Sequence, residues 1–272
     1  MRTSEWINVV VFSFLGTLAW FRPLSTRARM KICTAAGAGL CATAIGSHLL
    51  PRILSPLATS VCRDWLPSLL MVMVYWQAGQ FANRVDEQVQ RKLVRLDERL
   101  VLPLLADLRK RRLGAWLLTI LEIAYLFCYP MVPLSLAALY IMRMGRQADH
   151  FWTVVLAASY TCYVAFPFIQ TLPPRMLAEQ QGVPLAPGGI RIFNLWILRH
   201  ASIHANTFPS AHVAASMACA LVLLRLAPGV GVVFLLVAAC IALGAVAGRY
   251  HYAADAILGA LVAMVAFVIA RL

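Results

Sequence analysis

The chain contains eight apolar runs that reach, or nearly reach, the length needed to cross the hydrocarbon core of a membrane. A helix rises about 1.5 Å per residue, so one crossing takes about 20 residues. Only 13% of the residues are charged, about half the share of a typical soluble domain. The sequence therefore predicts an all-α, polytopic membrane bundle of about eight transmembrane helices. The runs cover residues 7–21, 32–50, 65–82, 113–142, 151–172, 211–227, 229–248 and 252–270.

The run at 113–142 is longer than one crossing needs and contains Pro130 and Pro133. We interpret it as one kinked helix that crosses the membrane, and a re-entrant hairpin is the alternative. Counted from the N-terminus, residues 1–64 are predicted to form two additional transmembrane helices. Residues 65–272 are then predicted to form a six-helix core.

Two segments between the runs predict helices at the membrane surface. Residues 83–112 carry nine basic and five acidic side chains, with leucines at helical spacing from Leu93 to Leu108. This pattern is typical of an amphipathic helix lying on the membrane. Residues 190–199 predict a short interfacial helix that could act as a lid, preceded by irregular backbone around Pro184 and Pro187.

The net charge of +13 favours contact with anionic lipid headgroups. The basic residues are scattered among short loops, which argues against nucleic acid as a partner. If all eight runs cross, the loops at 22–31, 83–112, 173–210 and 249–251 lie on one side of the membrane. The polar clusters described next also fall on that side.

The first cluster is Tyr250-His251-Tyr252-Ala253-Ala254-Asp255, between two apolar runs. A carboxylate at the edge of the hydrocarbon needs a partner. His251 precedes Asp255 by four residues, so on a helix the two side chains would share one face. Such a pair orients the imidazole and raises its basicity, as a nucleophile or a general base requires.

The second cluster, Asn206 to His212, leads directly into the sixth apolar run. Ser210 is a good N-cap, and the backbone N–H groups of Ala211 and His212 follow it. A helix start of this kind binds anions, above all phosphate. His212 would be placed to donate a proton to a leaving group. The alternative is a simple cap with an interfacial histidine.

Two arginines on the same side are candidate phosphate ligands. Arg175 follows Pro173-Pro174, and Arg249 lies two residues before His251. Both could clamp phosphate oxygens, and the alternative for Arg175 is an anchor at the membrane interface. Glu122, within an apolar run, is expected either to bond a facing hydroxyl group or to act near a substrate headgroup.

A metal site is not predicted. His200 and His204 are four residues apart, but Pro209 argues against one continuous helix that would bring His212 beside them. We also expect no cofactor.

These motifs resemble a known superfamily. Pro209-Ser210-Ala211-His212 resembles the Pro-Ser-Gly-His motif of type 2 phosphatidic acid phosphatases, which share a superfamily with vanadium haloperoxidases. His251-Tyr252-Ala253-Ala254-Asp255 resembles its His-x-x-x-Asp motif. The alanine in place of glycine and the form His-Tyr-x-x-Asp are closer to the inositol phosphorylceramide synthase and sphingomyelin synthase branches.

The resemblance implies a role for each matching residue. His251 would attack phosphorus and carry a phosphohistidine intermediate, and Asp255 would hold its imidazole. His212 would protonate the leaving group and then activate water or an acceptor hydroxyl. Arg175, Arg249 and Ser210 would hold the phosphoryl oxygens without a metal ion.

Two departures concern the basic residues of the superfamily. Its first motif has a lysine where this chain has Phe168, and a proline after the arginine where this chain has Met176. Its third motif in the phosphatases has an arginine six residues before the histidine, where this chain has Ala245. Arg249 could replace that arginine, or the site could work with one arginine fewer.

The sequence thus predicts a membrane-embedded lipid phosphatase acting on a phospholipid or a polyprenyl diphosphate. The first alternative is a phosphotransferase that moves a phospho-headgroup to a lipid or polyol hydroxyl. The second is a non-catalytic transporter or scaffold. Two arguments disagree on the side of the membrane that the site faces. Of the 24 lysines and arginines, 17 lie on the motif side, which the positive-inside rule places in the cytoplasm. The resemblance implies an extracytoplasmic site, and that is our expectation.

Overall fold

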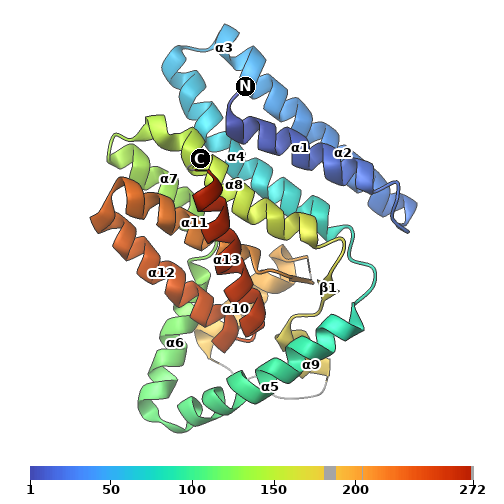
Figure 1. Cartoon of the computed structure of the whole chain (residues 1–272), viewed down its shortest axis with the longest axis vertical. Coiled ribbons are helices and arrows are strands. Elements are labelled where there is room, and N and C mark those ends of the chain that lie inside the picture. The colour runs from blue at the N-terminus through green and yellow to red at the C-terminus, as the bar shows by residue number, and fades with distance from the viewer. Residues whose placement is uncertain (181–187, 204, 271–272) are drawn as a thin grey trace.

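The computed structural model describes residues 1–180, 188–203 and 205–270 of the chain (Figure 1). Helices dominate the described residues, so the all-α prediction is confirmed. The elements are α1 (Thr3–Leu18), α2 (Thr26–Ala44), η1 (Ile45–Leu49), α3 (Leu50–Ile53), α4 (Pro56–Gly79), α5 (Glu87–Lys110), α6 (Arg112–Leu126), α7 (Met131–Ile141), η2 (Gly145–Gln147), α8 (Ala148–Ala165), β1 (Gln170–Thr171), α9 (Pro174–Gln180), α10 (Gly189–Ala201), β2 (Asn206–Thr207), α11 (Ala211–Leu226), α12 (Pro228–Ala247) and α13 (Ala253–Ile269).

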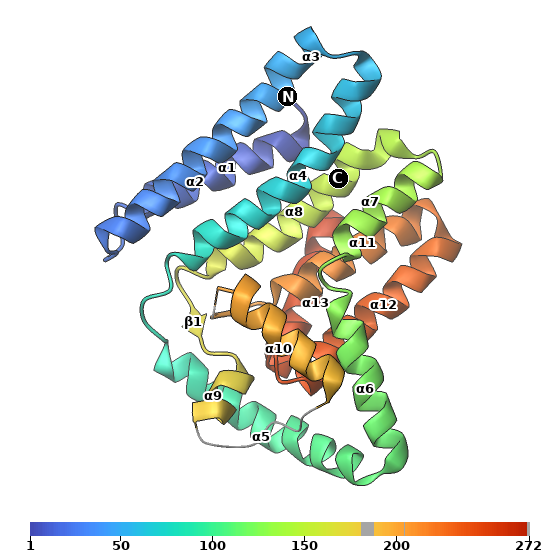
Figure 2. The same cartoon turned by 180° about the vertical axis from the view of Figure 1, so that it is seen from behind.

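Each predicted apolar run contains helix, although the run at 151–172 is helical only as far as Ala165 and includes β1. The run at 113–142 is two helices rather than one, because the chain breaks between α6 and α7 and bends by 70°. Pro130 stands directly before α7, where a missing N–H group costs nothing in the helix that follows. In both views α6 lies beside α5 and α7 lies toward the far end of the bundle (Figures 1 and 2).

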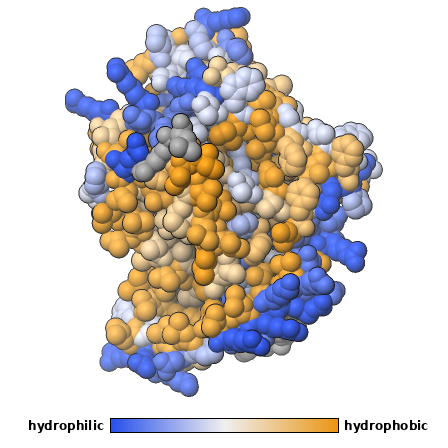
Figure 3. Space-filling model, in the orientation of Figure 1, coloured by the Kyte–Doolittle hydropathy of each residue, from blue (hydrophilic) through white to orange (hydrophobic). Residues whose placement is uncertain are grey.

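By length and hydropathy, three helical stretches among the described residues suffice to cross a membrane, or four if α6 and α7 form one crossing. α11 and α13 are apolar but shorter. The predicted number of eight crossings is therefore not established. Hydrophobic side chains cover the middle of the face formed by α11 to α13, and hydrophilic ones gather at one end and along α5 (Figure 3). This distribution fits a membrane protein.

The centre of the bundle is α8. Residues along its length are fully buried, among them Phe151, Val155 and Ala158. α8 packs against α1, α4, α11 and α13. A helix that is buried on several sides needs apolar side chains on each of them, which explains the composition of α8. α1 and α2 form a pair that packs on α4 and α8. α4 begins at Pro56, so the predicted boundary at residue 64 falls inside a helix.

The helices that carry the polar clusters start near α5, at one end of the bundle. α5 begins after Asp86, whose side chain accepts hydrogen bonds from the N–H groups of Gln88 and Val89. α5 is amphipathic, with buried side chains such as Leu93 and Leu105 on one face and exposed ones such as Leu100 on the other. Beside it, β1 and β2 form a short antiparallel pair that joins two distant loops.

Candidate active site

Asp255 lies in the first turn of α13, and His251 lies before the helix begins. The two residues are therefore not on one continuous helix, as the sequence analysis assumed. Tyr252 is the N-cap, and its N–H donates to Asp255 Oδ2 at 3.1 Å. That bond folds the carboxylate back toward the loop, where the same oxygen lies 3.4 Å from His251 Nδ1. The predicted pair forms by capping geometry rather than by helical periodicity.

The pairing determines which ring nitrogen of His251 is free. A carboxylate can only accept a hydrogen bond, so the proton of a neutral imidazole sits on Nδ1. Nε2 then keeps its lone pair. Nε2 is therefore the ring nitrogen that can act as a nucleophile, and His251 lines a cavity.

Asn206 in β2 completes the surroundings of the carboxylate, and the sequence analysis did not assign it a role. Its Nδ2 donates to Asp255 Oδ2 at 2.7 Å and to Thr171 Oγ1 of β1 at 2.9 Å. Both Asp255 and Asn206 are almost completely buried. Its position three residues before the Pro-Ser-x-His motif is the sequence signal that could have pointed to it.

His212 enters the same cavity from the first turn of α11. Its ring lies 6.0 Å from the ring of His251, and their planes are nearly perpendicular. Ser210 caps α11 by accepting from Val213 N, and its own N–H donates to the backbone oxygen of Asp255 at 3.0 Å. Gly259 packs directly against the Ser210 carbonyl, where a side chain would clash. These contacts fix the start of α11 against α13.

Ser210 and Ala211 are engaged within the protein. The Ser210 side chain is fully buried and does not line the cavity, whereas Thr207 does. The N–H of Ala211 points at Thr207 Oγ1 at 3.4 Å. In this conformation the structure thus places Thr207, rather than Ser210, at the wall of the cavity.

Arg175 is the arginine that lines the cavity. It lies at the start of α9, only 7% exposed, with its N–H donating to the Arg249 carbonyl at 2.9 Å. Its guanidinium lies 3.5 Å from the carbonyl oxygen of Tyr250. The cavity is small, with a volume of about 20 Å³. Its walls are Tyr75, Tyr125, Arg175, Leu198, Ser202, Ala205, Asn206, Thr207, His212, Tyr250 and His251.

Arg249 points away from this cavity. Its Nη1 donates to Asp97 Oδ2 of α5 at 2.7 Å, and the other oxygen of Asp97 accepts the N–H of Ala253 at 3.2 Å. Arg249 also has a φ of 61°, which is uncommon for a residue with a side chain. Burial raises the pKa of Asp97 above its ordinary value, although the Ala253 N–H and the Arg249 charge oppose the shift. The ion pair holds the loop before His251 on α5.

A second contact from α5 reaches the other side of the same loop. Gln90 donates to the Tyr252 hydroxyl, and its Oε1 accepts the N–H of Leu172 at 2.7 Å. Gln90 and Asp97 are seven residues apart on α5, so both face the site. α5 therefore connects the loop of Arg175 with the loop of His251.

Glu122 is bound by three side chains from two elements. The Tyr250 hydroxyl donates to it at 2.5 Å, Arg191 at 2.5 Å and Asn194 at 2.8 Å. The prediction that Glu122 bonds a facing hydroxyl is confirmed. Arg191 was not predicted to matter, yet it is 8% exposed and also donates to the Gly248 carbonyl.

Two of the residues that depart from the superfamily motifs, Ala245 and Phe168, have apolar side chains. Ala245 is fully buried, and its carbonyl accepts the N–H groups of Tyr250 and His251. Phe168 is half exposed, with the Arg22 guanidinium 5.4 Å from its ring centroid. The ring of His200 hydrogen-bonds with the Trp196 carbonyl. His204 lies outside the described residues.

The sequence profile of the PAP2 superfamily matches residues 91–269, which include both histidine motifs and Arg175. The chain belongs to the PAP2 superfamily. No curated protein and no solved structure matches the chain. The matched region starts inside α5 and ends at the last residue of α13.

Proposed function

We propose that this protein is an integral-membrane lipid phosphatase that hydrolyses a phosphomonoester or diphosphate through a phosphohistidine intermediate. The observation that carries the proposal is the shared cavity of His212, His251 and Arg175, with Asp255 behind His251. Superfamily membership supports phosphatase-type chemistry. The apolar helices support a lipid as the substrate.

The geometry supports two half-reactions. In the first, the lone pair of His251 Nε2 attacks phosphorus, the bond to the leaving oxygen breaks, and His212 gives that oxygen a proton. Asp255 stabilises the positive charge that develops on His251. In the second, His212 takes a proton from water, the water oxygen attacks phosphorus, and the bond to His251 breaks.

Arg175 is the cation placed to meet the charge on the phosphoryl oxygens. A buried guanidinium interacts more strongly with an anion than an exposed one, because less water screens it. We assign Arg249 a positioning role, since its charge is paired with Asp97. Ser210 likewise acts by fixing the start of α11 in this scheme.

Substrate entry requires a movement. A cavity of about 20 Å³ holds little more than one water molecule. Leu198 and Ser202 close it from α10 and the residue that follows, and the Ser202 hydroxyl contacts the Tyr75 hydroxyl at 3.3 Å. We infer that α10 opens as a lid, as the sequence analysis suggested.

A phosphotransferase is the second candidate, because Ala211 and Tyr252 give the motifs the synthase-like form. The same intermediate would then react with a lipid or polyol hydroxyl instead of water. A non-catalytic transporter or scaffold is the third candidate, and it would contain the motifs without turnover.

The test is to incubate the purified protein with phosphatidate, a polyprenyl diphosphate, or ceramide with phosphoinositide. Release of inorganic phosphate is expected for a phosphatase, and a new phospholipid for a transferase. His251→Ala should reduce turnover by about 1,000-fold or more while the protein stays folded. Undiminished turnover by a folded His251→Ala variant would refute the catalytic proposal.

We also propose that α4 to α13 form the catalytic core, that α1 to α3 are an addition, and that the site faces away from the cytoplasm. A cysteine at Gly188, an exposed position with open space around it, tests the orientation. We expect membrane-impermeant maleimide to label Gly188→Cys from the extracytoplasmic side, above the background of the seven native cysteines. Labelling from the cytoplasmic side alone would reverse the proposed orientation.

A further inference from the structure

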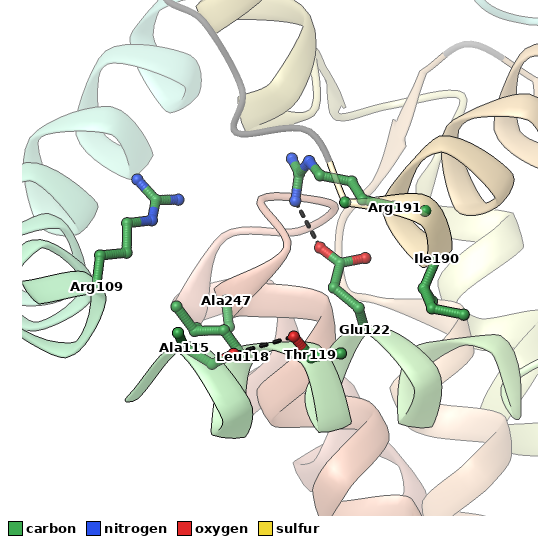
Figure 4. A pocket seen from close by; sticks show the side chains of 10 residues that line it. Arg109, Ala115, Leu118, Thr119, Glu122, Ile190, Arg191 and Ala247 are labelled. Carbon is green, nitrogen blue, oxygen red and sulfur yellow. Dashed lines mark hydrogen bonds and ion pairs between the residues drawn. The ribbon is translucent and has the colours of Figure 1, made fainter. Parts of the chain in front are cut away.

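A second and larger cavity lies next to the candidate active site. It has a volume of about 550 Å³ and opens between α5, α6, the start of α10 and the end of α12 (Figure 4). Arg109 projects into it from α5, and Glu122 and Arg191 face each other across its other end. Leu118 and Ile190 supply apolar wall. The cavity thus combines two guanidinium groups with an apolar lining.

The charges in this cavity do not balance. Glu122 is the acidic residue in the lining, and its carboxylate already accepts hydrogen bonds from Arg191, Asn194 and Tyr250. Within the described parts of the chain, no acidic side chain pairs with Arg109. Arg109 is largely exposed to solvent, and its partial burial together with the nearby charges of Arg191 and Arg249 lowers its pKa. An anion in the cavity would offset the repulsion between these positive charges.

The start of α10 adds further positive potential. Gly188 and Gly189 line the cavity and form the N-cap and first residue of a 13-residue helix. The N–H groups of a first helical turn carry partial positive charge and bind phosphate well. Arg191, on the same turn, is nine-tenths buried, and its Nε has no hydrogen-bond partner among the described residues.

The position of the cavity favours a lipid as the source of the anion. α6 begins at its rim, and the outward face of α6 exposes Leu113, Trp116 and Ile120. These side chains are suited to contact acyl chains, whereas α5 lies along the surface. A headgroup phosphate between Arg109 and Arg191 would therefore have its acyl chains beside α6.

We propose that this cavity is a second anion site that binds the phosphate headgroup of a phospholipid, separate from the cavity of the two histidines. Tyr250 connects the two sites, because it lines the histidine cavity and its hydroxyl bonds Glu122 in the second one. Its ring also stacks on Tyr125 with centroids 4.1 Å apart. The inference concerns binding, so it stands or falls independently of turnover at His251.

The experiment measures the binding of dihexanoyl phosphatidate to the full chain in detergent by calorimetry. His251→Ala serves as the background, so that hydrolysis does not disturb the titration. Adding Arg109→Gln should weaken one class of site about tenfold and leave the other unchanged. Lys110→Gln is the matched control, since Lys110 is an exposed neighbour on the same helix outside the cavity lining.

Two further arms complete the test. Inorganic phosphate should bind the second site at least tenfold more weakly than phosphatidate, and equal affinity would overturn the assignment to a lipid. Arg109→Glu should abolish the second class of binding. If Arg109→Gln and Arg109→Glu both bind phosphatidate as the Lys110→Gln control does, the proposed site is wrong. Loss of activity in His251→Ala alone would bear on the proposed function and not on this site.

Discussion

Buried carboxylates gather at two ends of this bundle, and Asp255 differs from those that pair with a guanidinium, such as Asp64 and Glu5 at the other end and Asp97 near its own. At the end where α1 and α8 begin, Asp64 pairs with Arg2 and accepts the Tyr140 hydroxyl at 2.6 Å. Glu5 there accepts two hydrogen bonds from the Arg63 guanidinium, at 2.7 and 2.9 Å. At the end where α13 begins, Asp255 is surrounded by Asn206, His251 and the Tyr252 N–H, and no arginine of the described part of the chain binds its carboxylate.

The difference separates a carboxylate that holds the fold from one that prepares chemistry. Asp64 and Glu5 have their negative charge cancelled by a guanidinium, so little of it remains for other groups. Asp255 has one oxygen without a partner among the described residues, and its other oxygen faces an imidazole. The sequence analysis singled out Asp255 and Glu122 but overlooked Asp64, Glu5 and Asp97, which are also buried.

The largest expected effect is on the activity of Asp255→Asn. The amide keeps the shape of the side chain but can present an N–H group to His251, which then holds the wrong tautomer. We expect turnover to fall about 10,000-fold, by analogy with catalytic triads. The measurement is steady-state turnover of the best lipid substrate, with thermal unfolding recorded alongside. If unfolding of the Asp255→Asn variant accounted for the whole loss of turnover, Asp255 would hold the fold as Asp64 does, and the distinction between the two ends would be wrong.

Asp64→Asn should give the opposite result. It removes the charge that faces Arg2 and keeps the shape, so we expect the free energy of unfolding to fall by about 2 kcal/mol. Turnover per folded molecule should stay within about twofold. Denaturant unfolding in detergent and activity of the folded fraction measure the two quantities. Lost turnover without lost stability would mean that the Asp64 end also serves the reaction.

Asp97 lies between these two classes, and we expect its substitution to change turnover less than that of Asp255 and more than that of Asp64. It pairs with an arginine, as Asp64 does, but that arginine precedes His251. We expect Asp97→Asn to lower kcat about 10- to 100-fold, because the loop of His251 loses its fixed position, with little change in KM. Glu98→Gln, an exposed neighbour on α5, is the control and should behave as the wild type. Equal behaviour of the two variants would leave α5 without a role in the site.

Much of the helical order was predictable because it follows from local patterns. The apolar runs, the leucine spacing of 83–112 and the cap at Ser210 each depend on residues close in the sequence. The motifs also pointed to His212, His251, Asp255 and Arg175, which the structure brings to one place. The break between α6 and α7 was harder to predict, since Pro130 allows either a kink or an interruption.

The remaining contacts join residues that are far apart in the sequence. Arg249 was predicted to bind phosphate because it lies near His251, but it pairs with Asp97, 152 residues earlier. Asn206 reaches Asp255 across 49 residues, and Arg191 reaches Glu122 across 69. No local pattern encodes such partners, because they depend on how helices pack.

The sequence by itself determined that this chain is helical, apolar and equipped with two histidine motifs of the PAP2 superfamily. Hydrophobicity, periodicity and capping act over a few residues, so they can be read directly from the chain. The tertiary structure alone decided which charged groups are neutralised and which remain available. That choice depends on distances between elements, and it is what separates Arg175 from Arg249 and Asp255 from Asp64.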